Sequence, residues 1–236
     1  MQYGKIVKAR FVERPNRFVA VVDIDGAPTT VHVKNTGRCK ELLVSGATVY
    51  LEDSCNPNRK LRHSLIAVEK GDLLVNMDSQ APNKVVGEGL KEGRIKLSGM
   101  GNLVTVKAEK TFGESRFDFY VVDEEGREGY VEVKGVTLED NGIASFPDAP
   151  TERGIKHLNE LVEVKEQGMY AGIVFVIQME GMKVFTPNDN RHKAFGEALR
   201  HAEKRGVEVI AHECKVTPET LTIGQTVPVD LILGTN

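Results

Sequence analysis

The stretch RFDFYVVDEEGREGYVEVKGV, residues 116–136, predicts two β-strands that carry charges among apolar residues. If residues 124–126 form a three-residue hairpin loop with the glycine in the left-handed conformation, Asp123 pairs with Arg127 and the register is fixed. Counting back along both strands places Asp118 opposite Glu132. Because side chains alternate between the two faces of a strand, Asp118, Glu132 and Lys134 are expected on one face.

The other face of this hairpin is expected to carry Phe117, Phe119, Val131 and Val133. Opposed side chains have Cβ atoms roughly 5 Å apart, so two facing carboxylates repel by some tenths of a kcal/mol. A divalent cation would turn this repulsion into coordination, since Mg²⁺ takes oxygen ligands and is often held by one or two carboxylates.

The hairpin therefore predicts a Mg²⁺ or Mn²⁺ site held by Asp118 and Glu132. Phosphodiester hydrolysis uses such a cation to polarise the phosphate and acidify a water, and Lys134 beside it would offset charge in the transition state. A surface lattice of ion pairs that also includes Arg116 is the alternative interpretation, because Glu-x-Lys alone is a common pattern.

Composition places the chain among globular proteins. It has 236 residues, of which 40% are hydrophobic, enough for one large domain or two small ones. Three cysteines without a CxxC pair suggest neither a disulfide framework nor a zinc ribbon, so a reducing cytoplasm is expected. No apolar run approaches the roughly 20 residues needed to cross a bilayer, so membrane insertion is not expected.

The charge is divided unevenly along the chain. Residues 1–70 hold 12 Lys and Arg against 7 Asp and Glu, whereas the remainder holds 19 against 27. A basic segment indicates contact with a polyanion, although a modest excess can equally be a solvated surface.

The basic segment has a strand-rich pattern of its own. Three strands, a short helix in GRCKELLVSG (residues 37–46) and two further strands give the order β-β-β-α-β-β. This order predicts a small OB-like barrel over residues 1–75, a fold that often binds single strands or oligosaccharides, with an SH3-like barrel as the alternative. Candidate nucleic-acid contacts at its turns, each of which could instead be an ordinary solubilising charge, are Arg14, Arg17, Lys34, Arg38, Arg59, Lys60 and Arg62.

Residues 76–236 predict an α/β domain. Helices are expected within residues 81–93, 148–168 and 189–206, and the apolar run 170–179 reads as a strand buried on both faces. A βαβ unit would make that strand parallel to residues 207–213, which gives a mixed sheet. On the second helix Arg153 and Lys156 have the spacing to grip phosphate, and His157 ranks below them.

Four segments carry a resemblance to a known family: HVKNTGRCKELL, SRFDFYV, YVEVKGVTLEDN and FPDAPTERGIKHLNEL. Together they resemble the sugar fermentation stimulation protein A family, which is described as DNA-binding and linked to the regulation of sugar (maltose) metabolism. The resemblance implies an OB-like domain followed by a domain similar to PD-(D/E)xK nucleases, with Asp118, Glu132 and Lys134 in the nuclease motif. It also implies an additional acid at Glu88, and more weakly at Glu109.

Two hypotheses follow: a metal-dependent nuclease guided by a basic OB domain, and a catalytically silent DNA-binding regulator that keeps the carboxylates. Nucleic acid is the expected partner, with DNA favoured, and the strand form and oligomeric state stay open. No helix-turn-helix pattern supports a conventional sequence-reading regulator. An oligosaccharide-binding protein is a third hypothesis, weakened by the absence of tryptophan.

Overall fold

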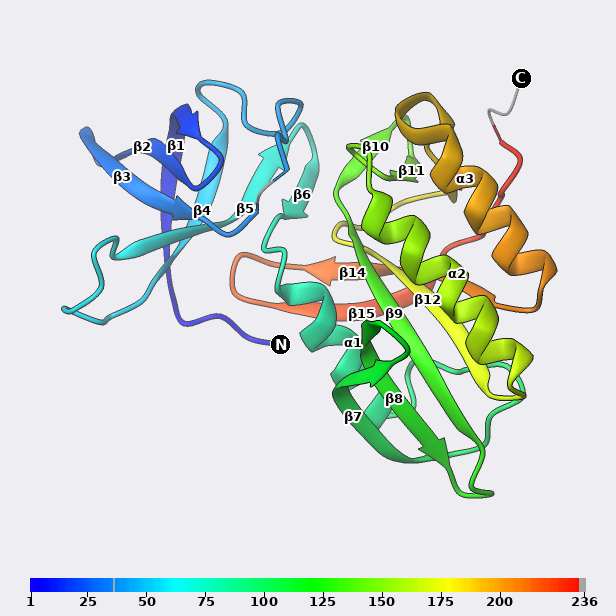
Figure 1. The fold of residues 1–236 in the computed structure, drawn as a ribbon. Coiled ribbons are helices and arrows are strands. Elements are labelled where there is room, and N and C mark those ends of the chain that lie inside the picture. Colours follow the sequence, from blue (N-terminus) through cyan, green and yellow to red (C-terminus); the bar gives the residue numbers. More distant parts are fainter. Residues whose placement is uncertain (36, 234–236) are drawn as a thin grey trace.

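The computed structural model describes residues 1–35 and 37–233, which form two lobes joined near residue 77 (Figure 1). The first lobe contains the strands β1 (Lys5–Asn16), β2 (Val19–Ile24), β3 (Ala27–Val33), β4 (Thr48–Asp53), β5 (His63–Lys70) and β6 (Leu73–Asn76). The second contains α1 (Ala81–Lys91), β7 (Leu103–Phe112), β8 (Ser115–Asp123), β9 (Glu128–Val136), β10 (Leu138–Asp140), β11 (Ile143–Phe146), α2 (Glu152–Glu166), β12 (Tyr170–Ile177), β13 (Val184–Pro187), α3 (Asp189–Lys204), β14 (Glu208–Val216) and β15 (Leu221–Thr226).

The first lobe is a closed barrel, so the predicted OB-like fold is confirmed. Its strands run in the order β3-β2-β1-β4-β5-β6, and an additional β3–β5 pairing closes the ring. The β2–β3 hairpin turns through Asp25 and Gly26, both with positive φ, as a two-residue turn of this handedness requires. Closure leaves this small sheet with few free edges, which limits unwanted strand pairing.

The prediction of a short helix over residues 37–46 is wrong. The segment is irregular and contains a single turn in which the N–H groups of Leu42 and Leu43 both donate to the carbonyl of Cys39. Cys39 has φ +45°, outside the right-handed helical region, so a regular helix cannot pass through it. A sixth strand, β6, which the sequence pattern did not show, pairs with β5.

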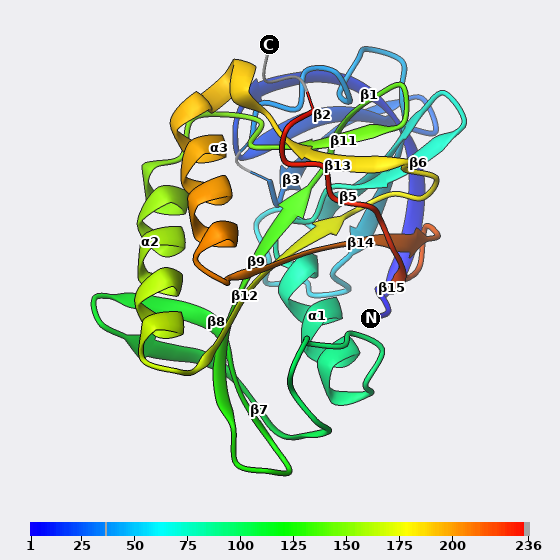
Figure 2. The ribbon, with the colours of Figure 1, turned by 90° about the vertical axis from the view of Figure 1, so that its right-hand side faces the viewer.

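The second lobe has a six-stranded mixed sheet in the order β15-β14-β12-β9-β8-β7, as expected for the α/β domain. Strand β12 is parallel to both β9 and β14, which confirms the βαβ unit. Helices α2 and α3 lie side by side over one face, and α1 covers the other face (Figure 2). A smaller sheet, β10-β11-β13, lies beside the large one.

Helix α2 shows why these segments are helical. Thr151 caps its start by accepting a hydrogen bond from the N–H of Gly154, and Gly168 follows its end with φ +82°. Leu158 and Leu161 are fully buried under it, and each such burial stabilises the fold by roughly 1.5–3 kcal/mol. None of the helices in the described part of the chain is long and apolar enough to span a membrane.

The β8–β9 hairpin has the register that the sequence predicts. The N–H of Asp123 donates to the carbonyl of Arg127 at 3.0 Å, Gly126 has φ +80°, and Tyr120 lies opposite Tyr130. The buried carboxylate of Asp123 also accepts the N–H groups of Gly101, Glu125 and Arg127 and the Nε of Arg127. Asp123 therefore anchors the loop that sets this register.

Acidification is expected to weaken the hairpin through Asp123. Burial raises the pKa of this carboxyl, but its hydrogen bonds with Gly101 and Arg127 outweigh burial and hold the pKa at about 2. A folded-state pKa below the unfolded value of about 3.9 contributes stability above pH 4 that is lost as the pH falls toward 2. The difference in melting temperature between wild type and Asp123→Asn should therefore shrink over this range. Glu163→Gln, which removes an exposed acid of α2, is the control, and a difference independent of pH would contradict this role.

Candidate active site

The strands β8 and β9 fork at two carboxylates. Their pairing runs from Val122 opposite Glu128 to Phe119 opposite Val131, and beyond it β9 continues to pair only with β12. At the fork the N–H of Val133 donates to Oδ2 of Asp118 at 2.8 Å, so a side-chain oxygen takes the place of a backbone acceptor. The register places Asp118 opposite Glu132 at this point.

Glu132 is a buried carboxylate whose two oxygens have different surroundings. Its Oε1 accepts a hydrogen bond from Nζ of Lys134 at 2.6 Å and another from Nδ1 of His157. Burial raises its pKa, but the His157 hydrogen bond and the Lys134 charge outweigh burial, so the pKa lies below its usual value. Its Oε2 is buried without a hydrogen-bond partner.

Asp118 is held by groups from two elements. Besides the N–H of Val133, the Nδ2 of Asn83 on α1 donates to its Oδ1 at 2.6 Å. Burial, and then the charge of Glu132, raise the pKa of Asp118 above its usual value in spite of these hydrogen bonds. The two acids thus repel each other at a fixed separation set by the strands.

The residues at the fork fit a divalent cation. A buried carboxylate oxygen without a partner is costly, and Glu132 presents one beside a second acid. Within residues 1–35 and 37–233, no three His, Cys, Asp or Glu side chains gather as a ready metal cluster. A cation here would take Asp118 and Glu132 and complete its shell with water and substrate oxygens, as Mg²⁺ commonly does.

Two side chains near the fork differ from expectation. Phe117 does not share a face with Phe119: its ring packs against Tyr130 and His157, whereas Phe119 belongs to the other hydrophobic cluster, with Val131 and Val133. Arg116 pairs with Glu109 of β7 at 3.4 Å on the exposed surface. The surface lattice of ion pairs therefore does not form around Asp118.

Glu88 lies elsewhere on α1. Its carboxylate accepts a hydrogen bond from the amino group of Met1 at 2.7 Å, and the residue of α1 that reaches Asp118 is Asn83. Glu109 has φ +57° within β7 and an exposed side chain. The structure thus brings together Asp118, Glu132 and Lys134, and gives Glu88 a contact with the N-terminus.

The candidate phosphate-binding residues of α2 lie on its exposed side. Arg153 donates from Nε to Nε2 of His157 at 3.3 Å, and His157 in turn contacts Glu132. Lys156 lies 2.9 Å from a carboxylate oxygen of Glu114 and 3.7 Å from Glu160. Both side chains come from the helix that covers the fork.

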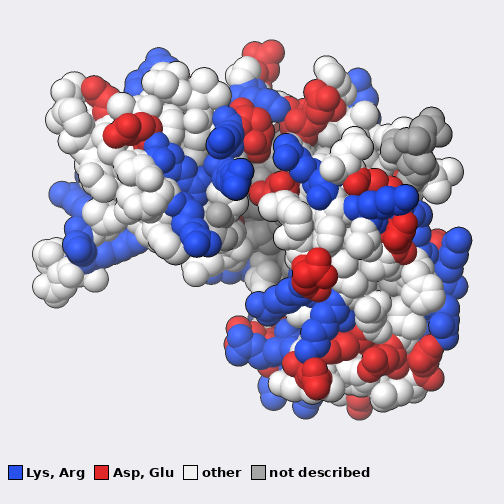
Figure 3. Space-filling view, turned by 45° about the horizontal axis from the view of Figure 1, so that its top comes forward, with Lys and Arg blue, Asp and Glu red and all other residues white. Residues whose placement is uncertain are grey.

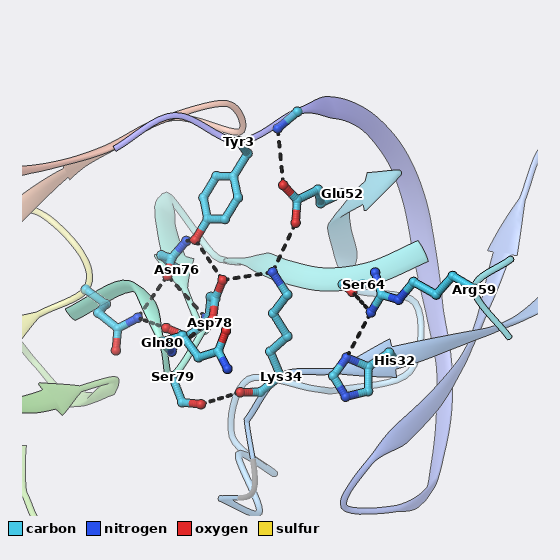
Figure 4. A network of polar contacts seen from close by, with 12 residues as sticks. Tyr3, His32, Lys34, Glu52, Arg59, Ser64, Asn76, Asp78, Ser79 and Gln80 are labelled. Carbon is cyan, nitrogen blue, oxygen red and sulfur yellow. Dashed lines mark hydrogen bonds and ion pairs between the residues drawn. The ribbon is translucent and has the colours of Figure 1, made fainter. Parts of the chain in front are cut away.

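Three candidate basic residues of the barrel are held by internal partners. Lys34 points into the junction between the lobes, where its Nζ lies 3.0 Å from Glu52 and 3.2 Å from the buried Asp78 (Figure 4). Arg62 forms two hydrogen bonds with the buried carboxylate of Asp53, and Arg59 donates to Ser64 at 2.8 Å.

Arg14 is also held by hydrogen bonds within the barrel. Its two terminal nitrogens donate to four backbone carbonyls, those of Arg17, Asn35, Gly37 and Arg38, and so hold the irregular segment after β3 in place. The other three candidates are exposed: the guanidinium of Arg17 lies over the ring of Phe18, and Arg38 and Lys60 are at loop surfaces.

Sequence patterns did not predict the contact of Asn83 with Asp118 or that of His157 with Glu132. The contact of Asn83 depends on how α1 packs over the fork, which no local pattern encodes. The burial of His157 could have been predicted, because it is four residues before Leu161 and therefore on the same helical face. It is buried with that face, at 4% exposure, instead of pointing to solvent with Lys156.

Family models match both lobes: the SfsA N-terminal OB domain over residues 12–77 and the sugar fermentation stimulation protein RE domain over residues 80–220. The chain belongs to the sugar fermentation stimulation protein family. A homolog from Clostridium botulinum (strain Loch Maree / Type A3) is 51% identical over 226 residues, 96% of this chain and 97% of that protein. One from Desulfitobacterium hafniense is 50% identical over 235 residues, 99% of this chain and 100% of the other.

A solved structure of the family has the same fold. Pyrococcus furiosus SfsA, in complex with Ca²⁺, superposes with a TM-score of 0.86 at 27% identity and covers 98% of both chains. The predicted fold, an OB-like barrel followed by an α/β domain with a mixed sheet, is thereby confirmed for this member of the family.

Proposed function

We propose that this SfsA-family protein is a divalent-cation-dependent phosphodiesterase that acts on nucleic acid, with DNA the favoured substrate. The observation that carries the proposal is the carboxylate of Glu132, which is buried beside Asp118 and has one oxygen without a partner. Glu160 also has a buried oxygen without a hydrogen-bond partner, but Glu132 differs from it because its free oxygen lies beside a second acid, where a cation would offset both the lost hydrogen bond and the repulsion.

Asp118 and Glu132 are the residues that would hold Mg²⁺ or Mn²⁺. The Ca²⁺ complex of the Pyrococcus furiosus relative supports a cation with oxygen ligands in this family. When bound, such a cation supplies polarisation of the phosphate and acidification of a water. Asn83 orients Asp118 toward the site by holding its Oδ1.

Lys134 supplies the positive charge at the reacting phosphate. Its ammonium group is largely shielded from solvent and lies 2.6 Å from Glu132, and its charge also acts on Asp118. A fixed charge in a water-poor site stabilises negative charge that develops on phosphate oxygens. Arg153 and Lys156, on the exposed side of α2, would bind neighbouring phosphates and position the strand.

The barrel supplies a second nucleic-acid contact. A groove of about 490 Å³ is lined by Arg17, Arg38 and Lys40 and by the apolar residues Phe11 and Leu43. Figure 3 shows an indentation between the lobes with Lys and Arg side chains on both of its sides. A strand bound across the two lobes would meet positive charge on each.

A catalytically silent DNA-binding regulator of sugar (maltose) metabolism genes is the second candidate function. Two contacts favour it: the ammonium of Lys134 and the imidazole of His157 already satisfy Oε1 of Glu132 without any cation. Measuring binding and cleavage on the same labelled DNA separates the two candidates. Binding without cleavage in Mg²⁺ or Mn²⁺ would support the regulator.

Nucleic-acid affinity is expected to depend on the exposed basic residues of the barrel. Charge reversal at Arg17, Arg38 and Lys60 should weaken binding and reduce the slope of log K against log[salt] by about 0.9 for each phosphate that the variant no longer neutralises. Fluorescence anisotropy with labelled DNA at several salt concentrations measures both quantities.

The same charge reversal at three exposed lysines of α2 and α3, Lys165, Lys193 and Lys204, is the matched control. Arg14, Lys34 and Arg62 are left unchanged, because their internal contacts would confuse weaker binding with impaired folding. Equal reductions in affinity in the two triple variants would show that the barrel has no specific role.

A further inference from the structure

His157 joins α2 to the carboxylate of the fork. It is buried, and its ring lies between two groups: Nδ1 is hydrogen-bonded to Oε1 of Glu132, and Nε2 lies 3.3 Å from Nε of Arg153. The rings of Phe117 and His157 pack at an interplanar angle of 60° with 5.9 Å between centroids, and the buried Leu158 follows His157 in α2. The imidazole therefore has little freedom to turn.

The contact with Arg153 fixes the tautomer of His157. A guanidinium can only donate hydrogen bonds, so Nε2 of the imidazole must be the acceptor. The proton of the neutral ring is then on Nδ1 and points at Glu132. Arg153, His157 and Glu132 thus form a chain of donors that runs in one direction, from the helix surface to the fork.

Oε1 of Glu132 receives the end of this chain together with the ammonium of Lys134. Two donors on one oxygen hold the carboxylate in a single rotation and leave Oε2 as the oxygen without a partner. A carboxylate that ligates a cation is commonly held in this way by hydrogen bonds from residues that do not touch the metal.

We propose that His157 and Arg153 are positioning residues that hold Glu132 with its Oε2 directed at the divalent cation. The inference rests on the proposed function, because it assumes that a cation binds at Asp118 and Glu132. Neither residue touches the cation: Arg153 sets the tautomer, and His157 sets the rotation of the carboxylate.

Calorimetric titration of the full-length protein with Mn²⁺ tests this role. His157→Leu keeps an apolar volume but removes the donor, and its Kd for Mn²⁺ is expected to rise by about 10- to 100-fold. His157→Asn places an amide N–H where Nδ1 lies, so it should restore most of the affinity. Glu163→Gln, which removes an exposed acid from the same helix, should leave the Kd unchanged.

Two further measurements keep the test decisive if His157→Leu fails to fold. Arg153→Ala changes only an exposed side chain. It is expected to weaken Mn²⁺ binding, because without Arg153 the proton of the His157 imidazole can lie on either ring nitrogen. Nitrogen-15 NMR of the imidazole should show the proton on Nδ1 in wild type and a mixture of tautomers in Arg153→Ala. A purely structural role for His157 would alter folding without changing either signal.

The outcomes separate the inference from the proposed function. A wild type that binds no Mn²⁺ at all overturns the proposed site and the inference with it. Wild-type affinity in both His157→Leu and Arg153→Ala overturns only the positioning role and leaves the cation site standing. Weak binding in His157→Leu with recovery in His157→Asn supports both.

Discussion

Cleavage of labelled DNA in Mg²⁺ or Mn²⁺ is expected to fall by about 10²- to 10³-fold when Lys134 is replaced by alanine, the usual effect of removing one group that stabilises transition-state charge. Nucleic-acid affinity should change little, because the ammonium is shielded from solvent and is one of several basic groups facing the substrate. Rates measured at saturating DNA, together with affinities from anisotropy, distinguish these two effects.

Lys107→Ala, an exposed change on β7, is the control for this experiment and should cleave at the wild-type rate. In a silent binding module, Lys134→Ala would cause only a modest reduction in affinity. Cleavage that survives undiminished in Lys134→Ala would show that the reaction takes place at another site, whatever its metal dependence.

Mg²⁺ or Mn²⁺ is expected to raise the melting temperature of the wild type and not that of the Asp118→Asn, Glu132→Gln double variant. A ligand at about 100 times its Kd stabilises the folded state by about 2.7 kcal/mol, which for a chain of this size corresponds to a shift of about 5 to 10 °C. Scanning calorimetry in cation and in EDTA measures the shift.

The two substitutions are chosen to preserve the fold. In Glu132→Gln the remaining oxygen can accept from Lys134 and His157, and the new NH₂ takes the position of Oε2, where it repels a cation. In Asp118→Asn the side-chain oxygen can accept from Val133 while the amide of Asn83 turns to accept. An equal rise in wild type and double variant would place the cation elsewhere.

The hairpin could be predicted from sequence because its information is local. A glycine at the third loop position and an acid opposite an arginine fix the register, and the pairs Asp123–Arg127 and Tyr120–Tyr130 follow. The same register brings Asp118 and Glu132 to the fork. The βαβ unit could also be predicted from sequence, because its strand β12 is a continuous apolar run.

Features that depend on contacts between residues distant in sequence could not be predicted. The segment 37–46 has helix-forming residues, but Arg14 from β1 binds the carbonyls at its start and Cys39 turns the chain out of helical geometry. The sequence did not show that Lys34 and Arg62 are paired. Asp78, the partner of Lys34, is distant in sequence, and Asp53, the partner of Arg62, lies on β4. In each case tertiary contacts override a local pattern.

We propose that phosphodiester bonds are hydrolysed at the fork of β8 and β9 with the help of a divalent cation. Incubation of the wild type with labelled DNA and RNA, as single strands, duplexes, flaps and junctions, in Mg²⁺, Mn²⁺ or EDTA tests it most directly. We expect cleavage of at least one substrate in Mg²⁺ or Mn²⁺, none in EDTA, and none by Glu132→Gln. Cleavage by Glu132→Gln at the wild-type rate, or no cleavage of any substrate by the wild type with either cation, would contradict the claim.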